Sequence, residues 1–211
     1  MGFGVLGTFR GAAGQMLAGV SDICLRVVDG VVQVFTATRA GGGILALELQ
    51  ATGEGLALID QQGIAAGQVL SAPGRLSFLT VGGQAALVWT GGWAADPGGW
   101  QIGAGGQIGD RLLLSGGPSG VIAAQAFAQV AGSGFAVLAP ARAGVLEVWA
   151  VAETGRMQLR HSLTFGEAGQ GFDVTALESL RIGGAQFILS LSAGEDALAV
   201  HRLRADGTLQ T

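Results

Sequence analysis

The sequence predicts an all-β fold, a β-propeller of four blades, and three observations lead to it. Residues 27–49, 80–102, 129–151 and 181–203 resemble one another, and each contains a glycine-rich turn followed by two apolar, strand-length runs. The turn glycines Gly30, Gly83, Gly134 and Gly184 are 53, 51 and 50 positions apart. A second marker, the dipeptide Gly-Gln at 14–15, 67–68 and 169–170, keeps the same phase. A β unit of about 50 residues that repeats is typical of a propeller blade.

Each unit has the pattern of four short antiparallel strands. In the second unit we expect strands at about 76–81, 84–90, 99–103 and 111–115, joined by glycine-rich turns as hairpins require. Both faces of such strands are apolar, so a blade buries them only by stacking on its neighbours. The expected blades are 14–63, 67–116, 120–165 and 169–211, in a single domain, 1–211. A β-solenoid and a two-sheet sandwich are alternatives, but the tight hairpin turns and the period favour the propeller.

The fourth unit ends in a strand that is unusually short. After the turn Ala-Asp-Gly only the residues TLQT remain. Residues 5–9 precede the first Gly-Gln marker, where other units have a last strand, so we expect them to complete the last blade and close the ring. The alternative is that the four blades are half of a larger propeller, completed by another copy of the chain or by more chain.

Composition excludes several classes of protein. Only 12% of the residues are charged, the net charge is −4, and no basic stripe is present, which argues against nucleic-acid binding. The uncharged stretches 76–95 and 112–141 are long enough to span a membrane, but glycines break them into strand-length pieces, so we expect no membrane insertion. No N-terminal signal peptide is visible, and the single cysteine, Cys24, allows no disulfide within the chain.

The fourth unit, GGAQFILSLSAGEDALAVHRLRADGTL, resembles a known repeat. Similar repeats occur at the N-terminal ends of large secreted haemolysin-type (RTX) calcium-binding proteins of alphaproteobacteria. The matching residues are Gly183, Gly184, Phe187, Ile188, Leu189, Leu198, Val200, Arg202, Leu203, Asp206, Gly207 and Leu209. The calcium-binding nonapeptide GGxGxDxUx of those proteins is absent. The resemblance therefore implies a propeller-like module alone, non-catalytic and surface-associated.

The sequence contains no recognisable catalytic or metal-binding motif. The two histidines, His161 and His201, lie in expected strands and have no HExxH or His-x-His spacing, so we expect no metal site. A GxSxG nucleophile motif and a phosphate-binding loop are also missing. We accordingly expect no enzyme and no cofactor.

Propeller geometry predicts where a binding site would lie. Loops between the second and third strands of each blade gather on one face, and such loops carry functional diversity. An exposed tryptophan beside arginine and carboxylate groups suits sugar stacking or a protein contact. The candidate binding residues in these loops are Trp93, Arg39, Arg142, Asp96 and Glu195.

Three functions are compatible with these patterns. The first is a binding or display module of a secreted or particle-borne surface assembly, which contacts a glycan or a protein through one propeller face. The second is a structural subunit of a phage-like tail, spike or fibre, favoured by the low surface charge. The third is a lactonase-like or hydrolase-like propeller enzyme. The expected partners are other protein subunits or a cell-surface glycan, in an oligomer or larger assembly, and the expected location is extracellular or a virion-like particle.

Overall fold

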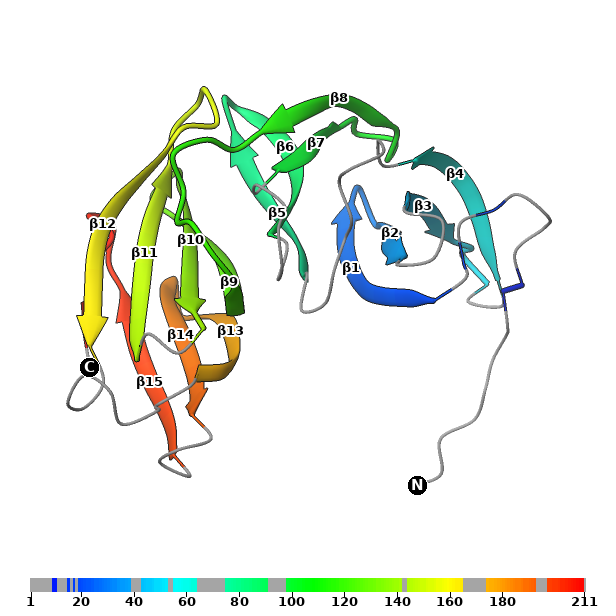
Figure 1. The fold of residues 1–211 in the computed structure, drawn as a ribbon. Helices are drawn as coiled ribbons and strands as arrows, with labels where there is room; N and C mark the ends of the chain where they lie inside the picture. The colour runs from blue at the N-terminus through cyan, green and yellow to red at the C-terminus, as the bar shows by residue number, and fades with distance from the viewer. Residues whose placement is uncertain are drawn as a thin grey trace.

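The structure is a four-bladed β-propeller, as the sequence predicts (Figure 1). It is a computed structural model that describes residues 9–10, 15, 17, 19–38, 43–52, 55–63, 75–90, 98–141, 144–164, 174–192 and 197–210. Each blade is a four-stranded antiparallel sheet whose strands pair in chain order. The blades follow one another along an arc, from blade 1 at the right of Figure 1, through blade 2 at the top, to blades 3 and 4 at the left.

The sixteen strands of the described residues divide evenly among the blades. Blades 1 and 2 contain β1 (Val20–Val28), β2 (Val31–Thr38), β3 (Gly43–Leu49), β4 (Leu56–Gly63), β5 (Arg75–Val81), β6 (Gln84–Thr90), β7 (Gly98–Ile102) and β8 (Ile108–Leu113). Blades 3 and 4 contain β9 (Ile122–Val130), β10 (Ser133–Pro140), β11 (Val145–Val151), β12 (Met157–Thr164), β13 (Val174–Ile182), β14 (Ala185–Ser192), β15 (Ala197–Leu203) and β16 (Leu209–Gln210). The first strands β1, β5, β9 and β13 lie side by side near the axis and are the inner strands.

A two-residue turn joins the first two strands of every blade. Both central residues of each turn have positive φ, the conformation of type I′ hairpins, which Asp-Gly and Gly-Gly favour. In the third blade the turn falls two residues before the predicted Gly134, which instead lies within β10 and pairs with Gln129 and Val151. The central pairs are Asp29-Gly30, Gly82-Gly83, Ala131-Gly132 and Gly183-Gly184.

The hydrophobic core lies between blades rather than within one of them. In the part of the chain that the structure describes, three clusters of buried side chains join blade 1 to 2, blade 2 to 3 and blade 3 to 4. In the first of them Trp89 and Trp100 stack with ring centroids 4.5 Å apart, and both are buried, as expected for strand residues that fill the space between blades. Leu138 has the same role between blades 2 and 3, and Ile188 between blades 3 and 4. The stacked faces therefore stabilise the fold.

The short last strand is present. β16 pairs with β15 through Leu209 and Gln210, and it is the outermost described strand of blade 4. The predicted pairing of residues 5–9 beside this blade cannot be compared, because residues 5–8 lie outside the described part of the chain. In the described ranges, no helix has the length and apolarity to cross a membrane.

Candidate functional site

The five predicted binding residues lie outside the described structure. Trp93 and Asp96 belong to the segment between β6 and β7, Arg39 to that between β2 and β3, Arg142 to that between β10 and β11, and Glu195 to that between β14 and β15. The structure confirms that these segments connect second to third strands of the blades. The predicted role of these five side chains stays a prediction.

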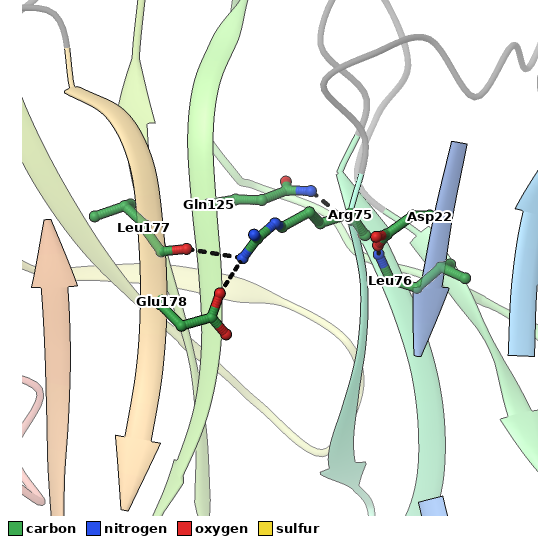
Figure 2. A network of polar contacts seen from close by, with 6 residues as sticks. All are labelled: Asp22, Arg75, Leu76, Gln125, Leu177 and Glu178. Atoms are coloured by element: carbon green, nitrogen blue, oxygen red, sulfur yellow. Dashed lines mark hydrogen bonds and ion pairs between the residues drawn. The ribbon is translucent and has the colours of Figure 1, made fainter. Parts of the chain in front are cut away.

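The described residues bring a different set of polar side chains together at the axis (Figure 2). Each inner strand contributes one member. Asp22 comes from β1, Arg75 from β5, Gln125 from β9 and Glu178 from β13. We call this set the axial network. Asp22, Arg75 and Gln125 lie in the first half of their strands, and Glu178 is the middle residue of β13.

Arg75 is the centre of the axial network. Its guanidinium Nη1 donates to Glu178 Oε2 at 2.6 Å and to the main-chain carbonyl of Leu177 at 2.8 Å. Its own main-chain carbonyl accepts a bond of 3.3 Å from Gln125 Nε2. This one residue of blade 2 therefore reaches both blade 3 and blade 4. Figure 2 shows the side chain extending from β5 to β13.

Asp22 adds blade 1 to the same network. Its Oδ2 accepts a hydrogen bond of 2.5 Å from the main-chain nitrogen of Leu76, next to Arg75. The carboxylate is half-buried, whereas 64% of the Glu178 side chain and 45% of the Arg75 side chain are exposed. Arg75 lies between the two carboxylates in Figure 2, so the axial network combines Asp22 and Glu178 with the cation of Arg75. Glu178 and Arg75 also border a small cavity of about 50 Å³.

A larger cavity lies at the opposite end of the inner strands, between blades 1 and 2. It has a volume of about 700 Å³ and we call it the hairpin-side cavity, because turns of β-hairpins border it. Val28, Ala85 and Ile102 supply apolar surface. Its exposed polar side chains are Gln84, Gln101, Gln107 and Asp110. Neutral amides and one carboxylate around an apolar floor suit a hydroxyl-rich ligand.

Arg26 borders the hairpin-side cavity, but its guanidinium is hydrogen-bonded within the protein. Its guanidinium donates to Gln33 Oε1 at 2.7 Å and to the main-chain carbonyl of Gly103 at 2.6 Å. The same group lies 5.3 Å from the ring centroid of Phe78. Burial lowers the pKa of Arg26 from its ordinary value. These contacts link blade 1 to the β7–β8 turn of blade 2. Arg26 therefore has a structural role, and its guanidinium is not free to bind a substrate.

The histidines and the cysteine lie on strands of the blades, and only His201 is fully buried, whereas His161 and Cys24 are half-buried. His201 is fully buried at the interface between blades 3 and 4, with Nε2 3.0 Å from Ser190 Oγ, and burial lowers its pKa. Burial, together with the negative charge of Asp22, raises the pKa of Cys24 to about 11. Within the described residues, no group of three or more His, Cys, Asp or Glu side chains could hold a metal ion.

The axial network was not among the residues predicted from the sequence. Asp22 and Arg75 each stand eight positions before their turn glycine, whereas Glu178 stands six before its own. The four residues therefore do not align in the repeat, and no motif marks them. The sequence contains only a weaker indication of these residues, which is a charged side chain inside an inner strand. Inner strands are surrounded by other strands, so an apolar side chain is expected there.

Comparison with known proteins identifies the fold and no family. No protein-family profile and no curated protein sequence matches the chain. Several solved structures share its architecture. A glycoside hydrolase family 43 arabinoxylan arabinofuranohydrolase from Bacillus subtilis, solved with cellotetraose, has a TM-score of 0.54 and 12% identity. That match covers 90% of this chain and 48% of the other, so the chain spans about half the length of the Bacillus enzyme.

Two further enzymes have similar propellers. An α-L-arabinofuranosidase from Clostridium thermocellum matches with a TM-score of 0.58 and 12% identity, over 90% of this chain and 70% of that one. An α-L-arabinofuranosidase from Podospora anserina, in complex with cellotriose, matches with a TM-score of 0.58 and 13% identity, over 95% and 69%. At such identities the likeness shows the fold alone.

These neighbours correct one expectation. The sequence predicted that the chain is not an enzyme, on the absence of catalytic motifs and on the implied non-catalytic repeat. That prediction is contradicted, because the solved propellers similar to this chain include glycoside hydrolases. Acid–base catalysis by carboxylates needs no local sequence motif, since the two acids come from separate strands. The resemblance to RTX repeats stays a prediction.

Proposed function

We propose that the chain is a carbohydrate-active, hydrolase-like propeller whose chemistry is carried by Asp22 and Glu178 of the axial network. The single observation that carries the proposal is that these two carboxylates, from the first and the last blade, bind adjacent residues of β5: Glu178 binds the Arg75 guanidinium, and Asp22 the main-chain nitrogen of Leu76. The fold shared with several glycoside hydrolases supports the reaction class. The proposed substrate class is a glycan, and the proposed reaction is hydrolysis of a glycosidic bond.

Glycoside hydrolysis generally requires two carboxyl groups on opposite sides of the scissile bond. One protonates the leaving oxygen, and the other acts on the anomeric carbon directly or through water. In the proposed site the two groups come from β1 and β13, strands held in place by their own sheets. Arg75 fixes the Glu178 carboxylate with a bond of 2.6 Å, and its charge-assisted hydrogen bond restricts the rotamers of an otherwise exposed side chain.

The test is hydrolysis of chromogenic glycosides and polysaccharides by the 211-residue chain. A panel of p-nitrophenyl pentosides and hexosides, with arabinoxylan and a β-1,3-galactan, covers substrates related to those of the structural neighbours. We expect turnover that Glu178→Gln and Asp22→Asn each reduce by roughly 100-fold or more, the usual contribution of a general acid or base.

The matched control is Glu153→Gln, which neutralises an exposed carboxylate in the β11–β12 turn, outside both the axial network and the hairpin-side cavity. We expect this variant to retain the activity of the wild type. Absence of turnover on the whole panel, or turnover that survives both axial substitutions, would overturn the proposal.

A second candidate function is glycan recognition at the hairpin-side cavity. It is favoured by three exposed glutamines and Asp110 around an apolar floor. Calorimetric titration with oligosaccharides distinguishes it from the first, because Gln101→Ala would weaken binding while Glu178→Gln would not. No binding heat, or binding that Gln101→Ala leaves unchanged, would contradict it.

A further inference from the structure

Blade 4 has an exposed apolar face that corresponds to the face of blade 3 buried against blade 4. In blade 3, Leu146 and Val148 of β11 are fully buried against blade 4. Val148 pairs with Val137, which stands five residues after the turn glycine Gly132. Val200 pairs with Leu189, which stands five residues after the turn glycine Gly184. Leu198 and Val200 thus occupy the repeat positions of Leu146 and Val148. They are, however, 63% and 52% exposed.

Blade 1 presents the complementary case. In blade 2, Leu76 and Phe78 of β5 pack against blade 1. Ile23 and Leu25 of β1 occupy the same repeat positions, because they stand the same number of residues before their turn glycine. Leu76 is only 7% exposed, whereas Ile23 is 58% and Leu25 62% exposed. Each end of the blade series therefore has one face built like an interface between blades and left open.

The two open faces are of opposite kinds. At the junctions within the chain, one blade contributes the face of its third strand, which contains Leu146 in blade 3. The next blade contributes the face of its inner strand, which contains Leu76 in blade 2. The open face of blade 4 is the third-strand face, and the open face of blade 1 is the inner-strand face. No cluster of buried residues joins blade 4 to blade 1 in the described part of one chain. The repeated interface thus identifies its missing partner: the first blade of another copy.

We propose that two copies of this chain associate head to tail, with blade 4 of each docked on blade 1 of the other. Each copy has one face of each kind, so a two-fold pair satisfies both and leaves no open apolar face. Patches of adjacent exposed Leu, Ile and Val side chains are uncommon on monomers and mark interaction sites. The new junctions repeat the contacts between blades already in the chain, and the proposal does not depend on the enzymatic function.

The test is the mass of the purified chain by size-exclusion chromatography with light scattering across a dilution series. We expect twice the 21.1 kDa of one chain. Leu198→Glu, on the blade 4 face, and Leu25→Glu, on the blade 1 face, should each raise the dissociation constant by roughly 100-fold or more, because each places a charge in both junctions of the pair. The control is Leu113→Glu, on β8 of blade 2, where a leucine is 62% exposed outside the two faces.

A mixing experiment tests the head-to-tail arrangement itself. When a tagged Leu198→Glu chain is mixed with an untagged Leu25→Glu chain, one of the two junctions contains no substituted residue. We therefore expect a heterodimer to form that neither variant forms alone, recovered through the tag. A monomer at all concentrations, a mass that Leu198→Glu leaves unchanged, a failure to complement, or an open polymer of many copies would each overturn the proposal. Circular dichroism of every variant verifies that it is folded.

Discussion

Gly155 joins blade 2 to blade 3, and its replacement by alanine tests the close approach of the two blades. Gly155 lies in the turn between β11 and β12 with φ of +81°, and a Cβ there would lie 2.5 Å from the main-chain oxygen of Leu113. Two backbone bonds hold this junction: Ser115 N to Gly155 O at 3.2 Å, and Met157 N to Ser115 O at 2.7 Å. A contact of 2.5 Å with a main-chain atom can be relieved only by moving one blade against the other.

The cost of Gly155→Ala has two parts. A left-handed φ costs an alanine about 1–2 kcal/mol. Separating the blades weakens two backbone hydrogen bonds, worth about 0.5–1.5 kcal/mol each. We therefore expect a loss of about 2–5 kcal/mol in the free energy of unfolding, measured by urea denaturation with tryptophan fluorescence.

Gly184→Ala is the matched control for this prediction. Gly184 has the same φ of +81°, but a Cβ there would meet nothing within 4 Å. Only the conformational cost of about 1–2 kcal/mol should remain. If the two variants lost equal stability, the close approach of Gly155 to Leu113 would be refuted, because the φ angles are the same and only the steric contact differs.

Three further predictions concern buried groups. Because burial lowers the pKa of His201 below its ordinary value of 6.5, the unfolded chain takes up a proton that the native chain resists, so stability falls as pH drops through and below about 6.5. The melting temperature should fall more from pH 7.5 to 5.0 in the wild type than in His201→Gln, and equal falls would contradict this. With a pKa of about 11, Cys24 should react with a disulfide reagent at pH 8 roughly 100-fold more slowly in the native chain than in urea, whereas equal rates would show an accessible thiolate. Leu138→Ala empties a fully buried position between blades 2 and 3 and should cost about 2–5 kcal/mol by urea denaturation, whereas Leu159→Ala, half exposed on β12, should cost much less; similar losses would argue against this packing.

The fold could be predicted from the sequence because it depends on local, repeated signals. Positive φ at both central residues of a hairpin turn requires residues such as Asp-Gly or Gly-Gly, and these recur with the blade period. The second strand of blade 2, expected at 84–90, is β6, Gln84–Thr90. The exception, Gly134, shows the limit. Ala131 adopts φ of +49° beside Gly132, a turn that composition alone does not favour over the nearby Ser-Gly.

Boundaries were predicted less well where a sheet is irregular. The last strand of blade 2 was expected at 111–115 and is β8, Ile108–Leu113. A register shift after Trp100 pairs Ile102 directly with Ile108, and a tight turn closed by the bond from Gly106 N to Gly103 O starts β8 early. Such a bulge adds a residue to one strand, and the sequence contains no periodic mark for it.

The axial network could not be predicted, for a related physical reason. Its members meet only because four separate sheets converge, and Arg75 contacts Leu177 across 102 positions of chain. Pattern arguments work within a strand or a hairpin, where the spacing of residues fixes their distance. They do not give the distance between side chains of blades 2 and 4. Predicting the four-blade architecture therefore left its axial chemistry undetermined.

The bond from Arg75 to blade 4 also has a consequence for the order of folding. Strands within a blade are joined by short connections, so their contacts close small loops at low entropic cost. The contact of Arg75 with Leu177 closes a loop of about a hundred residues and is expected to form after the individual hairpins. Replacing Arg75 with methionine should therefore accelerate unfolding while leaving the refolding rate nearly constant, a pattern that a chevron plot resolves. The contact of Arg75 with blade 4 would then form after the transition state for folding and would set the lifetime of the folded propeller.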